Sequence, residues 1–282
     1  MTRLDAHQHF WRFDPVRDAW ITPDMAAIRR DFLPADLAPA LAAAGMDGCI
    51  AVQADQSEAE TRFLLDLARA HDFIRGVVGW VDLRAADLDR RLAELSANPK
   101  LRGVRHIAQG EPDDFLGRDD VVRGIGRLPE FGLTYDILVY ERQLPSAIAL
   151  ADRLPEQRFV VDHLAKPRIR EGALEPWATH VRELARRPNV WCKVSGMVTE
   201  ADWRHWTPAG LRPYLDVAFE AFGPERLMFG SDWPVCLVAA PYAHVLGAVE
   251  EYAAACELPA HDHQAIFGGN AARFYGLDER GG

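Results

Sequence analysis

Two histidines separated by one residue lie near the start of the chain, in the segment RLDAHQHFW (residues 3–11). If this segment is a β-strand, side chains two positions apart project from the same face. The imidazoles of His7 and His9 then converge at the end of the strand, where they can bind a metal ion, a substrate or a proton. The meaning of the pair therefore depends on the element that positions it.

A second pair with the same spacing occurs in HDHQAIFGGNAARFYGL, which follows Pro259. This stretch has a helical pattern, and on a helix residues two apart diverge by about 200°. We therefore predict that His261 and His263 lie on the surface at a helix start, outside any shared site.

Short apolar segments of strand length recur eight times, at residues 3–10, 48–53, 74–83, 101–107, 133–140, 158–164, 189–197 and 226–233. Most are nearly continuous in Val, Ile, Leu and Phe, which is typical of parallel strands covered by helices. Amphipathic stretches lie between them. One of these, residues 57–72, begins with the favourable N-cap Ser57 and places Phe63, Leu64 and Leu67 on one face.

Eightfold alternation of strands and helices predicts a single (β/α)8 TIM barrel over residues 1–282, with its active site at the C-terminal ends of the strands. The competing fold is a doubly wound open sheet. That fold usually has a glycine-rich phosphate-binding turn after its first strand, whereas HQHFW follows here. The barrel is therefore favoured.

Composition restricts the class of protein further. The formal net charge of −10 argues against nucleic-acid binding, which needs a basic surface. No apolar run approaches 18 residues, and no signal peptide is recognisable, so we expect a cytoplasmic protein without a membrane span. The four cysteines form no CxxC pair, and we expect Cys49 and Cys192 to be buried and reduced.

Polar and aromatic residues collect where the predicted strands end, which in a barrel is one rim. Singly, each is best interpreted as a solvated loop residue or a satisfied core group, but their convergence indicates a site. The residues selected are His7, His9, Trp11, Gln53, Arg105, His106, Tyr140, His163, Lys166, Asp232 and Trp233. Lys193 and Ser195 could form a Ser–Lys nucleophile, but we interpret them as packing positions on the seventh strand.

The phrases DAHQHFW, VVDHLAKP, CKVSGM, MFGSDWPV and GGNAARFYGL together resemble the amidohydrolase superfamily, and within it the amidohydrolase-2 branch of sugar and aromatic-pathway lactonases. The resemblance extends from about residue 3 to residue 277. It implies hydrolysis of a sugar aldonolactone, such as L-fuconolactone or L-rhamnonolactone, to the aldonic acid. The implied partner is thus a small molecule, and either a monomer or a homodimer is compatible with the sequence.

The metal ligands of the superfamily are incompletely matched. Binuclear relatives use a carboxylated lysine on the fourth strand, where this chain has Arg105 and His106. Mononuclear relatives usually take a histidine from the fifth strand, which here ends in Tyr140. One Zn²⁺ could still be held by His7, His9 and Asp232, with His163 as a further ligand. We favour a metal-independent enzyme, because a lactone is an activated ester.

The chemical needs of lactone hydrolysis suggest a role for each selected residue. Asp232 would activate water, while His7, His9 and His163 would stabilise the oxyanion and protonate the leaving alkoxide. Trp11 and Trp233 would stack on the sugar, and the hydroxyl-binding residues would be Gln53, Arg105, His106, Tyr140 and Lys166. Two alternatives remain: a zinc-dependent hydrolase or decarboxylase of an aromatic-pathway acid or lactone, and a barrel that binds a sugar without catalysis.

Overall fold

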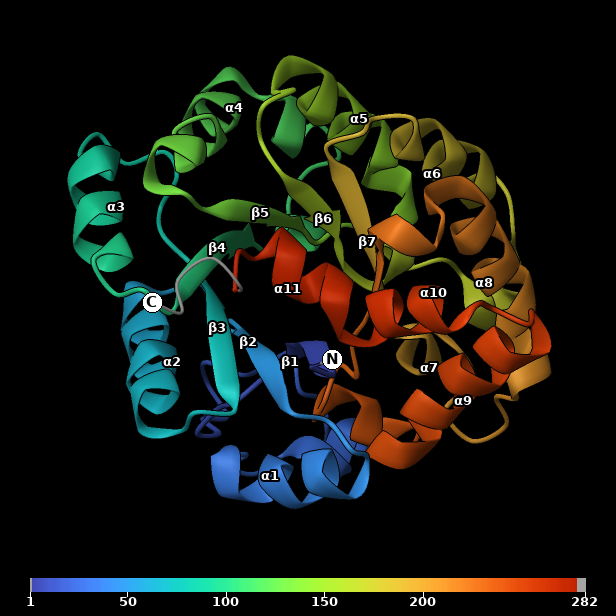
Figure 1. Ribbon diagram of the computed structural model, residues 1–282. Helices are drawn as coiled ribbons and strands as arrows, with labels where there is room; N and C mark the ends of the chain where they lie inside the picture. The colour runs from blue at the N-terminus through green and yellow to red at the C-terminus, as the bar shows by residue number, and fades with distance from the viewer. Residues whose placement is uncertain (1, 278–282) are drawn as a thin grey trace.

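The computed structural model describes residues 2–277 and shows eight parallel strands in sequence order around a nearly closed barrel (Figure 1). The strands are β1 (Leu4–Gln8), β2 (Gly48–Val52), β3 (Ile74–Gly79), β4 (Leu101–His106), β5 (Thr134–Ile137), β6 (Phe159–Val161), β7 (Val190–Val194) and β8 (Leu227–Phe229). The helices are α1 (Pro34–Ala43), α2 (Glu58–Ala70), α3 (Leu88–Ser96), α4 (Asp119–Ile125), α5 (Leu144–Arg153), α6 (Trp177–Ala185), α7 (Met197–Glu200), α8 (Pro208–Phe222), α9 (Tyr242–Ala255), α10 (Ala260–Gln264) and α11 (Asn270–Phe274). The predicted TIM barrel is confirmed.

The predicted strands extend too far at their C-terminal ends. Residues 158–164, for example, contain only the three-residue strand β6, and residues 226–233 contain only β8. The polar residues that end these segments leave the sheet and enter the loops above it, which frees their side chains for a site. Ser57 caps α2 as predicted, since its side chain accepts a hydrogen bond from the Glu60 amide.

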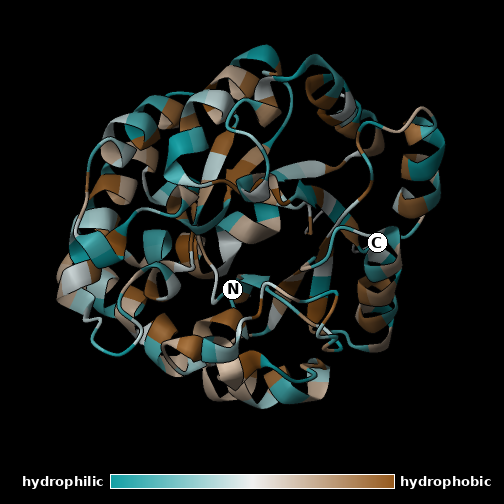
Figure 2. Cartoon of the chain, turned by 180° about the vertical axis from the view of Figure 1, so that it is seen from behind, coloured by the Kyte–Doolittle hydropathy of each residue, from teal (hydrophilic) through white to brown (hydrophobic). Residues whose placement is uncertain are grey.

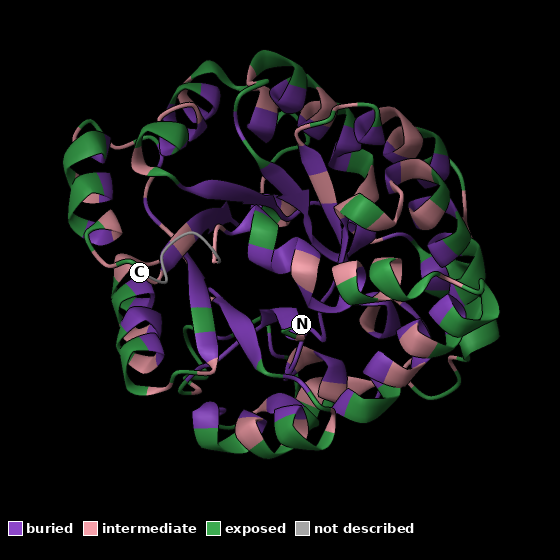
Figure 3. Ribbon diagram, in the orientation of Figure 1, coloured by how far each residue is buried: buried purple, intermediate pink, exposed green. Residues whose placement is uncertain are grey.

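Apolar packing occupies two layers. The larger one lies between the strands and the surrounding helices, whose inner faces are buried and outer faces exposed (Figure 3). Hydrophobic and hydrophilic bands alternate on these helices in the same way (Figure 2). The smaller layer lies inside the barrel, where Leu4, Ile50 and Met228 share a cluster with Phe274 and Tyr275 at the C-terminal end of the chain. One end of the barrel is therefore closed by apolar side chains, and the polar residues are confined to the other.

A few specific hydrogen bonds join the ends of β1 and β8 and so close the barrel. The Asp232 amide donates to the His7 carbonyl at 2.8 Å, and the His9 amide donates to the Trp233 carbonyl at 2.7 Å. The Asp5 carboxylate also accepts from the amide and hydroxyl of Ser231, at 2.9 and 2.6 Å. These bonds hold the histidines beside Asp232.

The helices, the cysteines and the second histidine pair were also the subject of predictions. Within residues 2–277, no helix is long and apolar enough to cross a membrane. All four cysteines are free, and Cys49 and Cys192 are buried as expected. His261 and His263 lie on the short helix α10, outside the cluster at the barrel mouth.

Candidate active site

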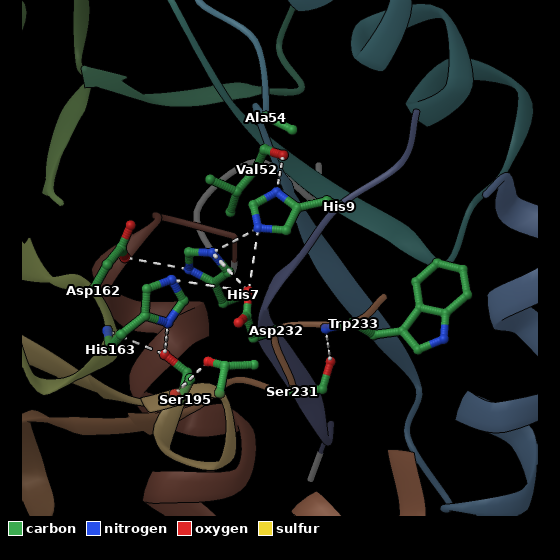
Figure 4. Close-up of polar contacts among 12 residues, drawn as sticks. His7, His9, Val52, Ala54, Asp162, His163, Ser195, Ser231, Asp232 and Trp233 are labelled. Atoms are coloured by element: carbon green, nitrogen blue, oxygen red, sulfur yellow. Dashed lines mark hydrogen bonds and ion pairs between the residues drawn. The ribbon is translucent and has the colours of Figure 1, made fainter. Parts of the chain in front are cut away.

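Three histidines and one aspartate form a compact cluster at the polar end of the barrel (Figure 4). His7 Nε2 lies 3.2 Å from His9 Nε2, and His9 Nε2 lies 3.4 Å from Asp232 Oδ1. The same carboxylate oxygen is 4.0 Å from His7 Nε2 and 3.9 Å from His163 Nε2. All four side chains are buried. The Nε2 atoms of His7 on β1, of His9 directly after it and of His163 in the loop after β6 converge on one carboxylate.

Each imidazole is oriented by a different group behind it. His9 Nδ1 donates to the Val52 carbonyl at 2.8 Å, which leaves the lone pair of a neutral ring on Nε2. Ser195 Oγ accepts from the His163 amide and lies 2.9 Å from His163 Nδ1. The serine hydroxyl can then donate to Nδ1, which favours a proton on His163 Nε2. His7 Nδ1 lies between a carboxylate and an ammonium group, described below.

An unusual backbone conformation places two members of the cluster. Four consecutive residues, His163 to Lys166, have φ between 51° and 58°, and Asp232 has φ 57°. Non-glycine residues rarely adopt this left-handed region, and it is enriched at functional sites. The turn directs both His163 and Lys166 into the same cavity. It explains why His163 lies beyond the end of β6, where a strand was expected.

The protonation states of the cluster suit a general base. Burial lowers the pKa of His7 well below its usual value and lowers the pKa of His163 to about 4. Burial raises the pKa of Asp232, but interactions with neighbouring groups, first among them His163, outweigh this effect, so its net pKa is lowered. At neutral pH, therefore, Asp232 is ionised while His7 and His163 are neutral.

A fully buried network of ion pairs lies behind His7. Lys193 Nζ contacts His7 Nδ1 at 3.2 Å, Asp162 Oδ1 at 3.0 Å and Asp136 Oδ2 at 2.5 Å. Asp162 Oδ1 lies 3.3 Å from His7 Nδ1, and its other oxygen accepts from Arg105 Nη1 at 3.0 Å. Lys193 is thus more than a packing residue, because it holds a histidine of the cluster.

Above the cluster is a cavity of about 200 Å³, below the usual size of a drug-sized ligand pocket. Its polar lining consists of His9, Arg105, Gln109, His163, Lys166 and Asp232. Its apolar lining consists of Trp20, Ala54, Ile107, Leu138 and Val235. The cavity therefore accommodates a small molecule with both hydroxyl groups and apolar carbon atoms.

The other residues selected from the sequence lie close to this cavity but do not line it. Trp11 donates to the Arg30 carbonyl and packs on Phe32, and Trp233 also packs on Phe32. In Figure 4 the Trp233 ring points away from the histidines.

The remaining selected residues contact their neighbours in the protein. Gln53 accepts from Arg105 Nη2 at 3.0 Å, and His106 is paired with Glu111 and stacked on Phe115. Tyr140 lies beneath the Lys166 ammonium, 5.7 Å from nitrogen to ring centroid.

Several site residues were not predicted. Trp20, Gln109 and Leu138 come from loops or strand ends without a recognisable motif, so the sequence carried no signal for them. Asp162 directly precedes His163 in VVDHLAKP. A charged residue at the end of a predicted strand could have been recognised as a candidate for the site. The buried partners of this aspartate, Arg105 and Lys193, come from other strands, which only the barrel brings together.

The cluster has a donor set that suits a metal ion. One ligand atom each from His7, His9 and Asp232 lie within 4.8 Å of one another, and so do atoms from His7, Asp162 and His163. Tetrahedral zinc with ligands about 2.0–2.1 Å away needs ligand atoms about 3.3 Å apart. The separations of 3.2, 3.4 and 4.0 Å in the first group are compatible with that geometry.

The chain is similar to known proteins over nearly its whole length. A family model described as amidohydrolase matches residues 4–277. The L-fucono-1,5-lactonase of Burkholderia multivorans is 46% identical over 98% of this chain and 97% of its own. That of Burkholderia ambifaria is 40% identical over 99% and 97%. A crystal structure of a Burkholderia multivorans amidohydrolase with bound zinc, 46% identical, has a TM-score of 0.94 and covers 98% of this chain and 100% of that one. The present chain therefore belongs to the amidohydrolase family.

Proposed function

We propose that this chain is a lactonase, a hydrolase of carboxylic esters, that converts L-fucono-1,5-lactone or a related deoxy-sugar lactone into the aldonic acid. The observation that carries the proposal is 46% identity, over nearly the whole of both chains, to an L-fucono-1,5-lactonase. The small cavity above a buried carboxylate and three histidines supports it, since ester hydrolysis needs a base and an oxyanion donor.

Two hydrogen-bond acceptors define the position of the attacking water. Asp232 Oδ1 and His9 Nε2 lie 3.4 Å apart, and neither carries a proton when Asp232 is ionised and His9 donates through Nδ1. A water molecule that donates to both atoms fits between them. Asp232 then takes a proton as the water oxygen attacks the lactone carbonyl carbon.

The neighbouring histidines provide the donors. His163 Nε2, protonated because Ser195 donates to Nδ1, can hydrogen-bond the carbonyl oxygen as negative charge develops. Collapse of the tetrahedral intermediate breaks the ring C–O bond, and the alkoxide recovers the proton held by Asp232. Arg105 and Lys166 line the cavity and bind the substrate oxygens.

We propose that this reaction does not require a metal ion, since the lactone is an activated ester. Where zinc is bound, His7, His9 and Asp232 would hold it, with His163 as a further ligand. Bound zinc supplies a Lewis acid for the carbonyl oxygen. In either case Asp232 must be ionised, and His9 must present Nε2 to the cavity.

An aromatic dicarboxylic acid suits the cavity less well than a neutral lactone. Its only cationic side chains with a fixed charge are Arg105 and Lys166, among the described lining residues. Arg105 is paired with Asp162, and Lys166 with Glu200 at 3.0 Å. Both charges are already offset by carboxylates of the protein, so the cavity has no surplus positive charge to balance a substrate that carries two carboxylates.

Proton release from a panel of aldonolactones, before and after exhaustive chelation, tests the proposal. We expect turnover of L-fucono-1,5-lactone that survives chelation, with far less than one metal ion per chain. Activity that vanishes and returns with zinc would assign His7, His9 and Asp232 as ligands. The absence of turnover on every lactone, with and without zinc, would refute the lactonase assignment.

The variant Asp232→Asn separates an enzyme from a sugar-binding barrel. Loss of the base should reduce kcat by about 10²–10⁴-fold, while binding of the aldonic acid product, measured by calorimetry, remains. Asp202→Asn, a change to an exposed aspartate remote from the cavity, provides the matched control. Undiminished turnover by Asp232→Asn would remove this residue from the mechanism.

A further inference from the structure

The guanidinium of Arg105, at the end of β4, contacts the nitrogen that a metal ion would need. Arg105 Nη1 lies 3.3 Å from His7 Nε2, and the side chain is 3% exposed. A zinc ion bound about 2.1 Å from that nitrogen would be less than about 6 Å from Nη1. Two cations would then share one small, dry pocket, in which their repulsion is only weakly screened.

Arg105 is held firmly in this position. Its Nη1 donates to Asp162 Oδ2 at 3.0 Å, and its Nη2 donates to the carbonyl oxygen and to Oε1 of Gln53. The Gln53 amide returns a hydrogen bond to the Arg105 carbonyl at 3.2 Å. The partners Asp162 and Gln53 lie directly after β6 and β2, so movement of the guanidinium away from His7 requires the loss of several contacts.

The buried charges near His7 already balance without a metal ion. The cations Arg105 and Lys193 are paired with the carboxylates Asp162 and Asp136. A carboxylate beside a histidine normally supports metal binding through that ring. Here Asp162 is bound by both cations, so Asp232 alone remains to offset a divalent ion.

We propose that Arg105 is the resident cation of this site, which both weakens the binding of divalent metal ions and stabilises the lactone oxyanion. The side chain lines the cavity, while its Nε–H, which has no hydrogen-bond partner within residues 2–277, is itself buried. The positive charge of the guanidinium therefore lies beside the cavity, where it stabilises negative charge that develops on the carbonyl oxygen. The second of these roles rests on the proposed lactonase activity, and the first does not.

Zinc titration by calorimetry, on protein freed of metal by chelation, tests the first role. Arg105→Met, which removes the charge at similar volume, should bind zinc at least tenfold more tightly than the unmodified protein. Arg105→Lys keeps the charge and should remain near the unmodified affinity. If Arg105→Met misfolds by circular dichroism, Arg105→Gln gives the same comparison, because its amide still offers a donor to Asp162.

Two outcomes of the titration would overturn the proposal. One is equal zinc affinity in the unmodified protein and the neutral variants. The other is submicromolar binding of one zinc ion per chain by the unmodified protein, a result that needs no variant.

Kinetics on the chelated proteins test the second role. Arg105→Met should lower kcat by about 10²–10³-fold, the usual effect of removing one group that stabilises an oxyanion, with a smaller change in KM. A rise in KM at constant kcat would contradict it. If the unmodified protein hydrolyses no lactone, the proposed function fails, while the zinc affinities still decide whether Arg105 excludes metal ions.

Discussion

The group behind each histidine decides which nitrogen can act in the cavity. The carbonyl behind His9 can only accept, whereas Ser195 can both accept from the His163 amide and donate to Nδ1. In the proposed reaction, His9 is consequently an acceptor in the cavity and His163 a donor. These two residues, although both are imidazoles, have opposite roles in the proposed reaction.

Ser195→Ala should weaken catalysis by removing the donor to His163 Nδ1. The ring could then adopt the other tautomer or rotate, and we expect kcat to fall by about 10–100-fold, the range found for groups that orient an active-site imidazole. KM should change little. Ser146→Ala is the matched control, since the Ser146 hydroxyl has no partner in the described structure and lies away from the cavity. Equal kcat in both variants would exclude a positioning role for Ser195.

The lowered pKa values of Asp232 and His163 predict a broad pH profile. Both groups keep their active forms on the alkaline side of these values, so kcat/KM should be flat from about pH 8 to about pH 5. It should fall only at lower pH, where His163 and then Asp232 take up protons. Chromatography of lactone consumption by the chelated enzyme, corrected for spontaneous hydrolysis, measures the profile. An acid limb centred near pH 6–7 would instead indicate an ordinary histidine base.

At the scale of the elements, the left-handed turn after β6 depends on the loop that follows β7. Gly196 has φ +65°, and a Cβ atom there would lie 2.6 Å from His163 Nδ1. Gly172 has nearly the same φ, +64°, but open space around the corresponding position. The two glycines therefore separate the effect of backbone strain from that of a clash with the histidine.

Gly196→Ala should displace His163 and reduce kcat by at least about tenfold, since catalysis is sensitive to shifts of an ångström. Gly172→Ala carries the same backbone cost, about 1–3 kcal/mol of unfolding free energy, and should retain its kcat. Steady-state kinetics together with denaturant unfolding distinguish the two effects. Equal kcat in both variants would show that His163 tolerates the added methyl group.

The elements also explain what could be predicted from the sequence. Buried parallel strands are recognisable as continuous apolar runs, and the strand ends of a barrel share one rim. The proximity of His7 and His9 to His163 and Asp232 could therefore be predicted from the sequence. Trp20 was not, because it lies in a loop with no periodicity. Nor was the role of Lys193, whose partners come from β1, from β5 and from the turn after β6. Trp11 and Trp233 have the residue type of a sugar platform, but their rings pack in the core.

At the scale of the whole molecule, the C-terminal segment is connected to the site through the centre of the barrel. α11 lies across one end of the strands (Figure 1), and Tyr275 follows it. The Tyr275 hydroxyl donates to Asp136 Oδ2 at 2.8 Å, and the same oxygen binds Lys193, which contacts His7. The segment that closes the apolar end thus supports the buried charges of the polar end.

Tyr275→Phe should therefore affect both stability and catalysis. The lost hydrogen bond leaves a buried carboxylate less satisfied, and we expect the free energy of unfolding to fall by about 1–3 kcal/mol. Lys193 would lose part of its support, so a smaller decrease in kcat should accompany this change.

Tyr252→Phe is the appropriate control, because the Tyr252 hydroxyl donates at the same 2.8 Å to Asp216, a carboxylate that is 53% exposed. Water can replace that bond, and both quantities should stay near those of the unmodified protein. Urea unfolding and steady-state kinetics on the two variants provide the comparison. Equal destabilisation would mean that Tyr275 acts only as a packing residue, and that the end of the barrel closed by α11 is energetically independent of the site.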